Sequence, residues 1–231
     1  MPGVWEFAFN TDDLAARSIG KQIKERQDIN ISDADLLNLI IRNIDSSIDA
    51  KKLSSLLIDK FETLGNVFLA TVHSLNSVEG MTNKCALLLK FFEFVHVRIA
   101  KSELSVRSPI DSPEALQQYL IYRMAHLVSE EFWIIYLDNR SMIIRDERVF
   151  QGTVNECAIY PREVIRRALE LGACSLILVH NHPSRRKLPS LDDIKVTREL
   201  AQAARMLSIG VHDHIIVSGG ECISMRELGH F

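Results

Sequence analysis

The feature that most constrains this chain is a run of four apolar residues, Leu176 to Val179, that ends in His180-Asn181-His182-Pro183. A short apolar run bounded by polar residues is typical of a strand buried on both faces of a sheet. Side chains alternate along a strand, so His180 and His182 are expected on one face, at the end of the strand. Pro183 has no backbone N–H and ends the pairing. The sequence thus predicts two neighbouring imidazoles at an open sheet end, which is half of a zinc site.

A helix after this strand is expected to supply the third ligand. Ser190 precedes apolar residues at helical spacing, which predicts that a helix begins there and that Asp193 lies in its first turn. If residues 185–189 fold back, the aspartate approaches both histidines. Two neutral nitrogens and one carboxylate, with a fourth position left for water, are typical of a catalytic zinc. A capping box would account for Ser190 and Asp193 without any metal, so both interpretations stay open.

These residues form the pattern His-x-His-Pro, six residues, Ser, two residues, Asp. The pattern resembles the metal motif of the JAMM (MPN-type, Jab-like) metallo-hydrolases. Flanking segments resemble the RadC family in particular, namely Gly152-Thr153-Val154-Asn155, Tyr160-Pro161-Arg162-Glu163, His180-Asn181-His182-Pro183-Ser184 and Asp213-His214-Ile215-Ile216. The resemblance is dense from about Ser108 to Phe231. It implies that His180, His182 and Asp193 bind Zn²⁺, and that the default reaction is hydrolysis of an amide or isopeptide bond.

The resemblance also implies a glutamate that opens the first strand and serves as general base. Glu131 directly precedes the apolar stretch Phe132–Ile135 and occupies the matching place. Glu130, one residue earlier, would face the other way on a strand, and Glu147 competes because it also lies on a predicted strand. We expect Glu131 to be the base and Ser190 to donate a hydrogen bond to the developing oxyanion. A solvated strand-end carboxylate is the alternative for each glutamate.

Two other polar segments need an interpretation. His212 and His214 flank Asp213, but no suitably spaced third ligand follows, so we expect them to support the ligands or to pack. Arg185, Arg186 and Lys187 lie in the loop beside the predicted metal, where three cations could attract an acidic peptide or a phosphate backbone. A solvated loop is the alternative. RadC-family members often carry Gly-Asp here, so the departure bears on the substrate rather than on the metal.

The whole chain is consistent with a two-domain globular protein. Its 231 residues are 47% hydrophobic and 25% charged. We expect an N-terminal extension over residues 1–30, a helical domain over 31–104 and the RadC-like JAB/MPN domain over 109–231, after a Ser- and Pro-rich linker. In the last domain predicted strands and helices interleave, which predicts an α/β fold with a mixed sheet flanked by helices. The resemblance implies the JAB/MPN, cytidine-deaminase-like form.

Charge and cysteine content limit the partners and the compartment. A net charge of −3 gives no overall attraction to nucleic acid, so any such contact must be local. The four cysteines include no C-x-x-C pair and are expected to be reduced thiols. There is no apolar run of membrane-spanning length and no leader-like N-terminus. We therefore expect a cytoplasmic protein without membrane contact; its oligomeric state is not predicted.

The helical domain offers one local route to nucleic acid. Residues 75–84 resemble a helix-hairpin-helix, which often precedes the catalytic part in RadC-like chains. The usual form has two glycines, whereas here Gly80 remains and Thr82 takes the second place. Lys84 could still reach a phosphate at the helix N-terminus. A helical docking domain that binds no nucleic acid is the alternative.

Three hypotheses follow for function. The first is a zinc-dependent hydrolase of JAMM type that cleaves amide or isopeptide bonds. The second is a DNA-associated repair or accessory protein, in which the metal is structural. The third is a metal-dependent phosphodiesterase that acts on nucleic acid. Assays on peptide and DNA substrates separate them.

Overall fold

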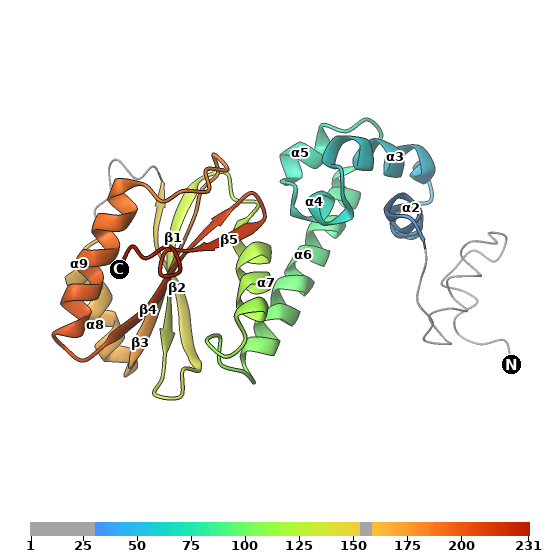
Figure 1. Ribbon diagram of the computed structural model, residues 1–231. Coiled ribbons are helices and arrows are strands. Elements are labelled where there is room, and N and C mark those ends of the chain that lie inside the picture. Colours follow the sequence, from blue (N-terminus) through green and yellow to red (C-terminus); the bar gives the residue numbers. More distant parts are fainter. Residues whose placement is uncertain (1–30, 153–158) are drawn as a thin grey trace, which may run out of the picture. The chain divides into compact units, whose positions relative to one another are not determined.

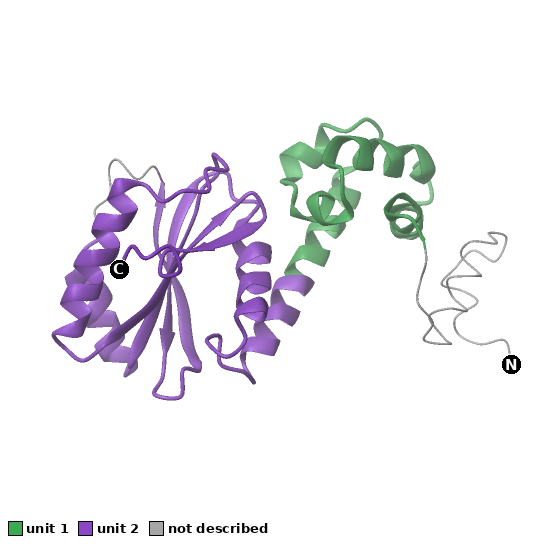
Figure 2. Ribbon diagram, viewed as in Figure 1, with its two compact units in different colours: residues 1–94 green, residues 95–231 purple. Residues whose placement is uncertain are grey.

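The computed structural model describes residues 31–152 and 159–231 (Figure 1). The chain forms two compact units, which divide between Phe94 and Val95 (Figure 2). The predicted N-terminal extension and residues 153–155 of the RadC-like segment that begins at Gly152 lie outside the described residues. In the described part, no helix combines the length and the apolar character that crossing a membrane requires.

The first unit is helical, as predicted. Its elements are α2 (Asp33–Ile44), α3 (Ala50–Phe61), α4 (Leu64–Leu69), α5 (Val72–Asn76) and the first part of α6 (Asn83–Leu104). The N-caps of α2 to α5 each accept a hydrogen bond from a first-turn N–H, which satisfies a donor that has no partner inside the helix. Leucines from different helices, among them Leu37, Leu53 and Leu89, are buried in one apolar core. The short helix α5 was not predicted.

The two units divide at a different place from the predicted domains, whose boundary lies between residues 104 and 109. The last part of α6 belongs to the second unit because Ala100 and Leu104 are buried in the same core as Leu116 and Leu120 of α7 (Pro113–Met124). The Ser- and Pro-rich segment is thus a connection between two helices of one unit, and the division of the chain falls inside a continuous helix.

The second unit contains a mixed sheet of five strands in the order β2-β1-β3-β4-β5. The strands are β1 (Glu130–Leu137), β2 (Ile143–Gly152), β3 (Ser175–Asn181), β4 (Gly210–Ser218) and β5 (Glu221–Ser224). The central strand β3 pairs antiparallel with β1 and parallel with β4, and all its residues are buried. The predicted buried strand and the predicted α/β class are both confirmed.

Helices cover the two faces of this sheet differently. Helix α7 covers one face, and α8 (Pro161–Leu171) and α9 (Leu191–Arg205) cover the other (Figure 1). Because side chains alternate along β1, Trp133 and Ile135 pack in the core with α7, whereas Phe132 and Ile134 pack in the core with α8 and α9. We call these the α7 face and the α8–α9 face.

Candidate metal centre

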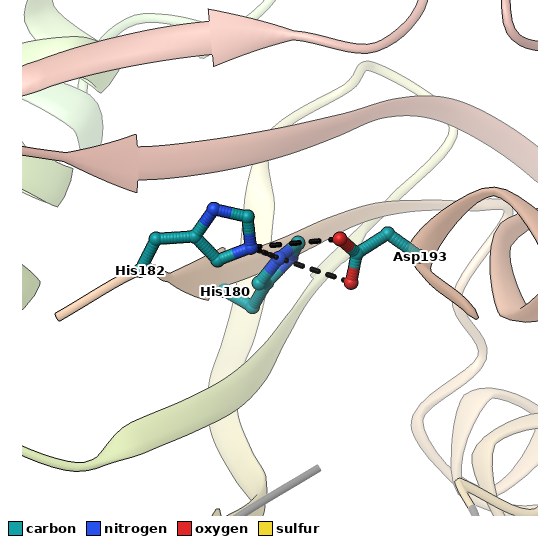
Figure 3. A group of neighbouring side chains, drawn as sticks. All are labelled: His180, His182 and Asp193. Atoms are coloured by element: carbon teal, nitrogen blue, oxygen red, sulfur yellow. Dashed lines mark hydrogen bonds and ion pairs between the residues drawn. The ribbon is translucent and has the colours of Figure 1, made fainter. Parts of the chain in front are cut away.

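The two predicted histidine ligands lie together at the end of β3. His180 is inside the strand and His182 directly follows it, where its N–H donates to the Val217 carbonyl at 2.9 Å. This bond keeps the backbone extended beside β4 for one more residue than β3 itself. Both imidazoles are buried, and their Nε2 atoms are 2.8 Å apart (Figure 3).

Asp193 reaches these imidazoles from the first turn of α9. Its Oδ1 is 3.2 Å from Nε2 of His180, and its Oδ2 is 3.5 Å from Nε2 of His182 (Figure 3). Its Oδ2 also accepts hydrogen bonds from the backbone N–H and the hydroxyl of Ser190, both at 2.7 Å. Together with the bond from Asp193 N–H to Ser190 Oγ, these contacts form a capping box. The capping box and the ligand position therefore coexist, because capping orients the carboxylate toward the histidines.

The three side chains suit a divalent metal ion. One ligand atom from each lies within 4.8 Å of the others. Nδ1 of His182 is 2.8 Å from the Arg186 carbonyl, which can only accept, so this nitrogen carries the ring proton and leaves Nε2 with a lone pair. Nitrogen and carboxylate lone pairs that converge so closely need either a proton or a metal ion between them. The residue types fit a three-ligand catalytic zinc site.

The pKa values show how strongly the acidic and basic groups are coupled. Burial alone would raise the pKa of Asp193, but hydrogen bonds to His180, His182 and Ser190 hold it well below its usual range. The pKa of His182 is raised, chiefly by its hydrogen bond to Asp193, against burial, with smaller contributions from the Arg186 carbonyl and the charges of Asp193 and Glu130. A proton and a metal ion therefore compete for the same imidazole nitrogens and carboxylate oxygens.

The two consecutive glutamates lie on opposite faces of β1. The side chain of Glu131 is buried, and its carboxylate accepts from Trp133 Nε1 at 2.8 Å and pairs with Arg148 at 3.0 Å. Trp133 belongs to the core of the α7 face. Phe132 pairs with His180 across the sheet and stacks on its ring, so Glu130, two residues before Phe132, shares the face of the histidines.

The role expected for Glu131 as general base stays a prediction, and the two glutamates differ in their contacts. Both glutamates line a cleft of about 200 Å³ next to His180 and Asp193. The carboxylate of Glu131, however, is held by an indole and a guanidinium. The half-buried Glu130 contributes to the raised pKa of His182, after the larger effects of Asp193 and Arg186. Glu147, the other candidate, is bound by two nitrogens of Arg167, at 2.9 and 2.5 Å.

Asn181 holds the backbone on both sides of Glu130. Its Oδ1 accepts from the backbone N–H of Glu131 at 2.8 Å, and its Nδ2 donates to the Ser129 carbonyl at 3.0 Å. The side chain is buried and both halves of the amide are used. Asn181 therefore fixes the start of β1 relative to the two histidines on either side of it in the sequence.

Two completely buried residues, His214 and Thr197, lie behind His180. The spacing of the candidate ligands in the sequence did not predict that these two residues contact each other. Nδ1 of His180 is 2.7 Å from Nε2 of His214, and Nδ1 of His214 is 2.5 Å from the hydroxyl of Thr197. Burial lowers the pKa of His214 far below its usual value, so its ring is neutral. His212 instead lines a separate hollow with Cys222, so of these two histidines only His214 contacts a candidate ligand, His180.

The basic residues proposed for phosphate contact lie in two places. In the loop after β3, Arg185, Arg186 and Lys187 are exposed, and Lys187 pairs with Glu221 at 2.8 Å. In the helical unit, Gly80 has φ of +83°, in the left-handed region, at the turn before α6, and Lys84 lies in the first turn of α6. These positions are compatible with the predicted contacts but do not test them.

The comparisons with known proteins agree with this architecture. A family model described as RadC-like JAB domain matches residues 110–230. A UPF0758 protein of Rhodobacter capsulatus is 39% identical over 197 residues, which cover 85% of this chain and 92% of that protein. Another UPF0758 protein, from Ruegeria pomeroyi, is 38% identical over 200 residues, which cover 87% of this chain and 89% of that protein.

Proposed function

This chain belongs to the RadC-like JAB domain family, and we propose that it is a zinc-dependent hydrolase of amide or isopeptide bonds. The observation that carries the proposal is the convergence of His180, His182 and Asp193 beside a cleft that Glu130 also lines. Structural zinc sites usually have four protein ligands, whereas catalytic sites have three and an open position. Three ligands next to a cleft therefore favour catalysis over a purely structural metal.

The reaction would divide its tasks among a few groups. A divalent ion held by the three ligands supplies Lewis acidity for the attack of water on a carbonyl. Glu130 accepts a proton from the attacking water at its carboxylate and returns it to the leaving nitrogen. Phe132, Phe150 and Val196 make part of the cleft wall apolar, which strengthens electrostatic interactions inside it.

We propose Glu130 rather than Glu131 as the general base for two reasons. Glu130 shares the sheet face of the histidines. Among residues 31–152 and 159–231, its carboxylate has no partner comparable to the indole and guanidinium that hold Glu131. Ser190 was expected to stabilise the oxyanion, but its hydroxyl proton is already donated to Asp193. We therefore assign Ser190 first to the orientation of Asp193; contact with the oxyanion would require its hydroxyl to change partner.

The test is a set of assays on the full chain, stripped of metal and reloaded with Zn²⁺. The substrates are quenched-fluorescence peptides, lysine isopeptides and bis(p-nitrophenyl) phosphate, and duplex and branched DNA are tested for binding at several salt concentrations. The proposal predicts zinc-dependent cleavage of an amide or isopeptide, lost in His182→Ala. Cleavage of only the phosphodiester would favour the nuclease-type alternative. One bound zinc with salt-sensitive DNA binding and no cleavage would favour the accessory-protein alternative.

A reducing compartment such as the cytoplasm is the location we propose. Among the described residues, Cys85, Cys174 and Cys222 are free thiols. Such cysteines are usual in reducing compartments, whereas secreted domains tend to form disulfides.

A further inference from the structure

A buried chain of hydrogen bonds joins two of the three metal ligands on the side away from the cleft. It runs from Nδ1 of His180 to His214, at 2.7 Å, and from His214 to the hydroxyl of Thr197, at 2.5 Å. The same hydroxyl is 2.5 Å from the backbone carbonyl of Asp193. His214 and Thr197 are both completely buried, so water does not compete for these bonds.

The direction of this chain follows from its last contact. The Asp193 carbonyl can only accept, and two oxygens 2.5 Å apart need a proton between them, so the Thr197 hydroxyl donates to it. The sulfur of Met225, at 3.9 Å from the same hydroxyl, is a much weaker acceptor. The Thr197 oxygen then accepts from Nδ1–H of His214.

The remaining protons are now determined. His214 is completely buried between His180 and the Thr197 hydroxyl, where a charged ring would be costly, so its imidazole has a single N–H. Its other nitrogen, Nε2, therefore has a lone pair and accepts from Nδ1–H of His180. That proton position leaves Nε2 of His180 with its lone pair facing Asp193 and His182. The opposite direction would place a proton on Nε2 of His180, where a metal ion has to bind.

We infer that Thr197 and His214 are positioning residues that lock His180 into the Nδ1–H tautomer and thereby prepare it to bind metal. His182 is locked in the same tautomer by a backbone carbonyl, so the two ligands achieve one result by different means. Because the chain ends on the backbone of Asp193, it also links the end of β3 to the first turn of α9. The inference rests on the proposed function only in taking these residues as ligands.

The tautomer can be measured without metal or substrate. Long-range ¹H–¹⁵N spectra of the histidine-labelled, metal-free full chain, at about pH 9 where ordinary imidazoles are neutral, distinguish Nδ1–H from Nε2–H. We expect Nδ1–H for His180 in the wild type and in Thr197→Ser, which keeps the hydroxyl. In Thr197→Val, which has nearly the same shape, we expect a mixture of tautomers or the Nε2–H form.

Zinc affinity, measured by competition with a chelator, gives a second result. Loss of a hydrogen-bond partner behind a ligand typically weakens metal binding by about 10–100-fold. We expect a weakening of this size in Thr197→Val and an affinity within about 3-fold of wild type in Thr197→Ser. His214→Gln, whose amide can still accept from His180, should bind more tightly than His214→Leu; this second pair serves if Thr197→Val does not fold.

Either of two results overturns the inference. One is an Nε2–H tautomer of His180 in the metal-free wild type. The other is equal zinc affinity for the folded variants of a pair. If the tautomer is as expected but no substrate is cleaved, the proposed hydrolase activity fails while this inference stands; if the chain is an active hydrolase with the opposite tautomer, the inference alone fails.

Discussion

The two faces of the sheet in the second unit are built from alternate residues of the same strands, yet they serve different purposes. On the α7 face, Trp133 and Arg148 both bind the carboxylate of Glu131. On the α8–α9 face, the imidazoles of His180 and His182 turn lone pairs toward Asp193. Buried polar groups that form hydrogen bonds and ion pairs with one another indicate a structural role. Buried acceptor groups that converge without a donor between them indicate a candidate binding site.

The largest expected effect distinguishes Asp193, the proposed metal ligand on α9, from its exposed neighbour Asp192. Asp193→Asn removes the charge that balances a divalent ion, and we expect zinc affinity to fall by more than the 10–100-fold typical of an outer partner. Asp192→Asn changes an exposed carboxylate one residue away and serves as the matched control. Isothermal titration with Zn²⁺ measures both, and equal losses would mean that only the local charge matters.

The second prediction contrasts the consecutive glutamates, one on each face. Glu130→Gln should lower kcat by about 10²–10⁴-fold, the usual contribution of a general base, with little effect on stability. Glu131→Gln should instead cost about 1–2 kcal/mol of unfolding free energy, because it breaks a partly exposed ion pair.

Urea unfolding measures the stability of both variants, and steady-state kinetics measure kcat for both. If Glu131→Gln abolishes turnover while Glu130→Gln leaves it unchanged, the assignment by sheet face is wrong and the sequence-based expectation is right. Zinc content measured in parallel shows whether either change acts through the metal.

A third prediction compares two buried tyrosines. The hydroxyl of Tyr119, in the core of the α7 face, binds Asp146, so Tyr119→Phe should cost about 1–2 kcal/mol of unfolding free energy. The buried hydroxyl of Tyr136, in the core of the α8–α9 face, has no hydrogen-bond partner among the described residues. Tyr136→Phe should therefore change stability by less than about 0.5 kcal/mol, or increase it. Thermal unfolding at neutral pH measures both; a large loss in Tyr136→Phe would reveal a hidden partner.

The smallest effect is a pH dependence on the α8–α9 face. Burial, with a smaller contribution from the charge of Glu147, raises the pKa of Tyr136 from 10.0 to about 12. The unfolded chain then loses the phenolic proton first, so stability falls as the pH rises from 10 toward 12. At pH 11 this amounts to about 1 kcal/mol, which Tyr136→Phe should not lose. Equal losses in wild type and variant between pH 9 and about 11 would contradict the assignment.

Local sequence patterns predicted much of the fold and most of the site. The apolar run before His180 predicted a buried strand, and Ser190 predicted the start of a helix. Both predictions use only residues that are neighbours in the sequence, and both elements form as expected. Asp193 was predicted for the same reason, because a capping position fixes where a first-turn side chain points.

What the sequence could not supply was the relation between distant segments. Two adjacent glutamates begin β1, and only its pairing with β3 through Phe132 and His180 reveals which one shares the histidine face. The link from His214 to Thr197 joins β4 to α9 and has no local signature. The compact units divide within the continuous helix α6, at a different place from the predicted domain boundary, and Ser and Pro mark a turn as readily as a linker.

The most direct test of the central claim is anomalous diffraction at the zinc edge from crystals of the full chain grown with Zn²⁺. We predict one strong peak about 2.0–2.2 Å from Nε2 of His180, Nε2 of His182 and an oxygen of Asp193, with Glu130 facing it across the cleft. A peak at another set of residues, or none at this site under saturating zinc, would contradict the account.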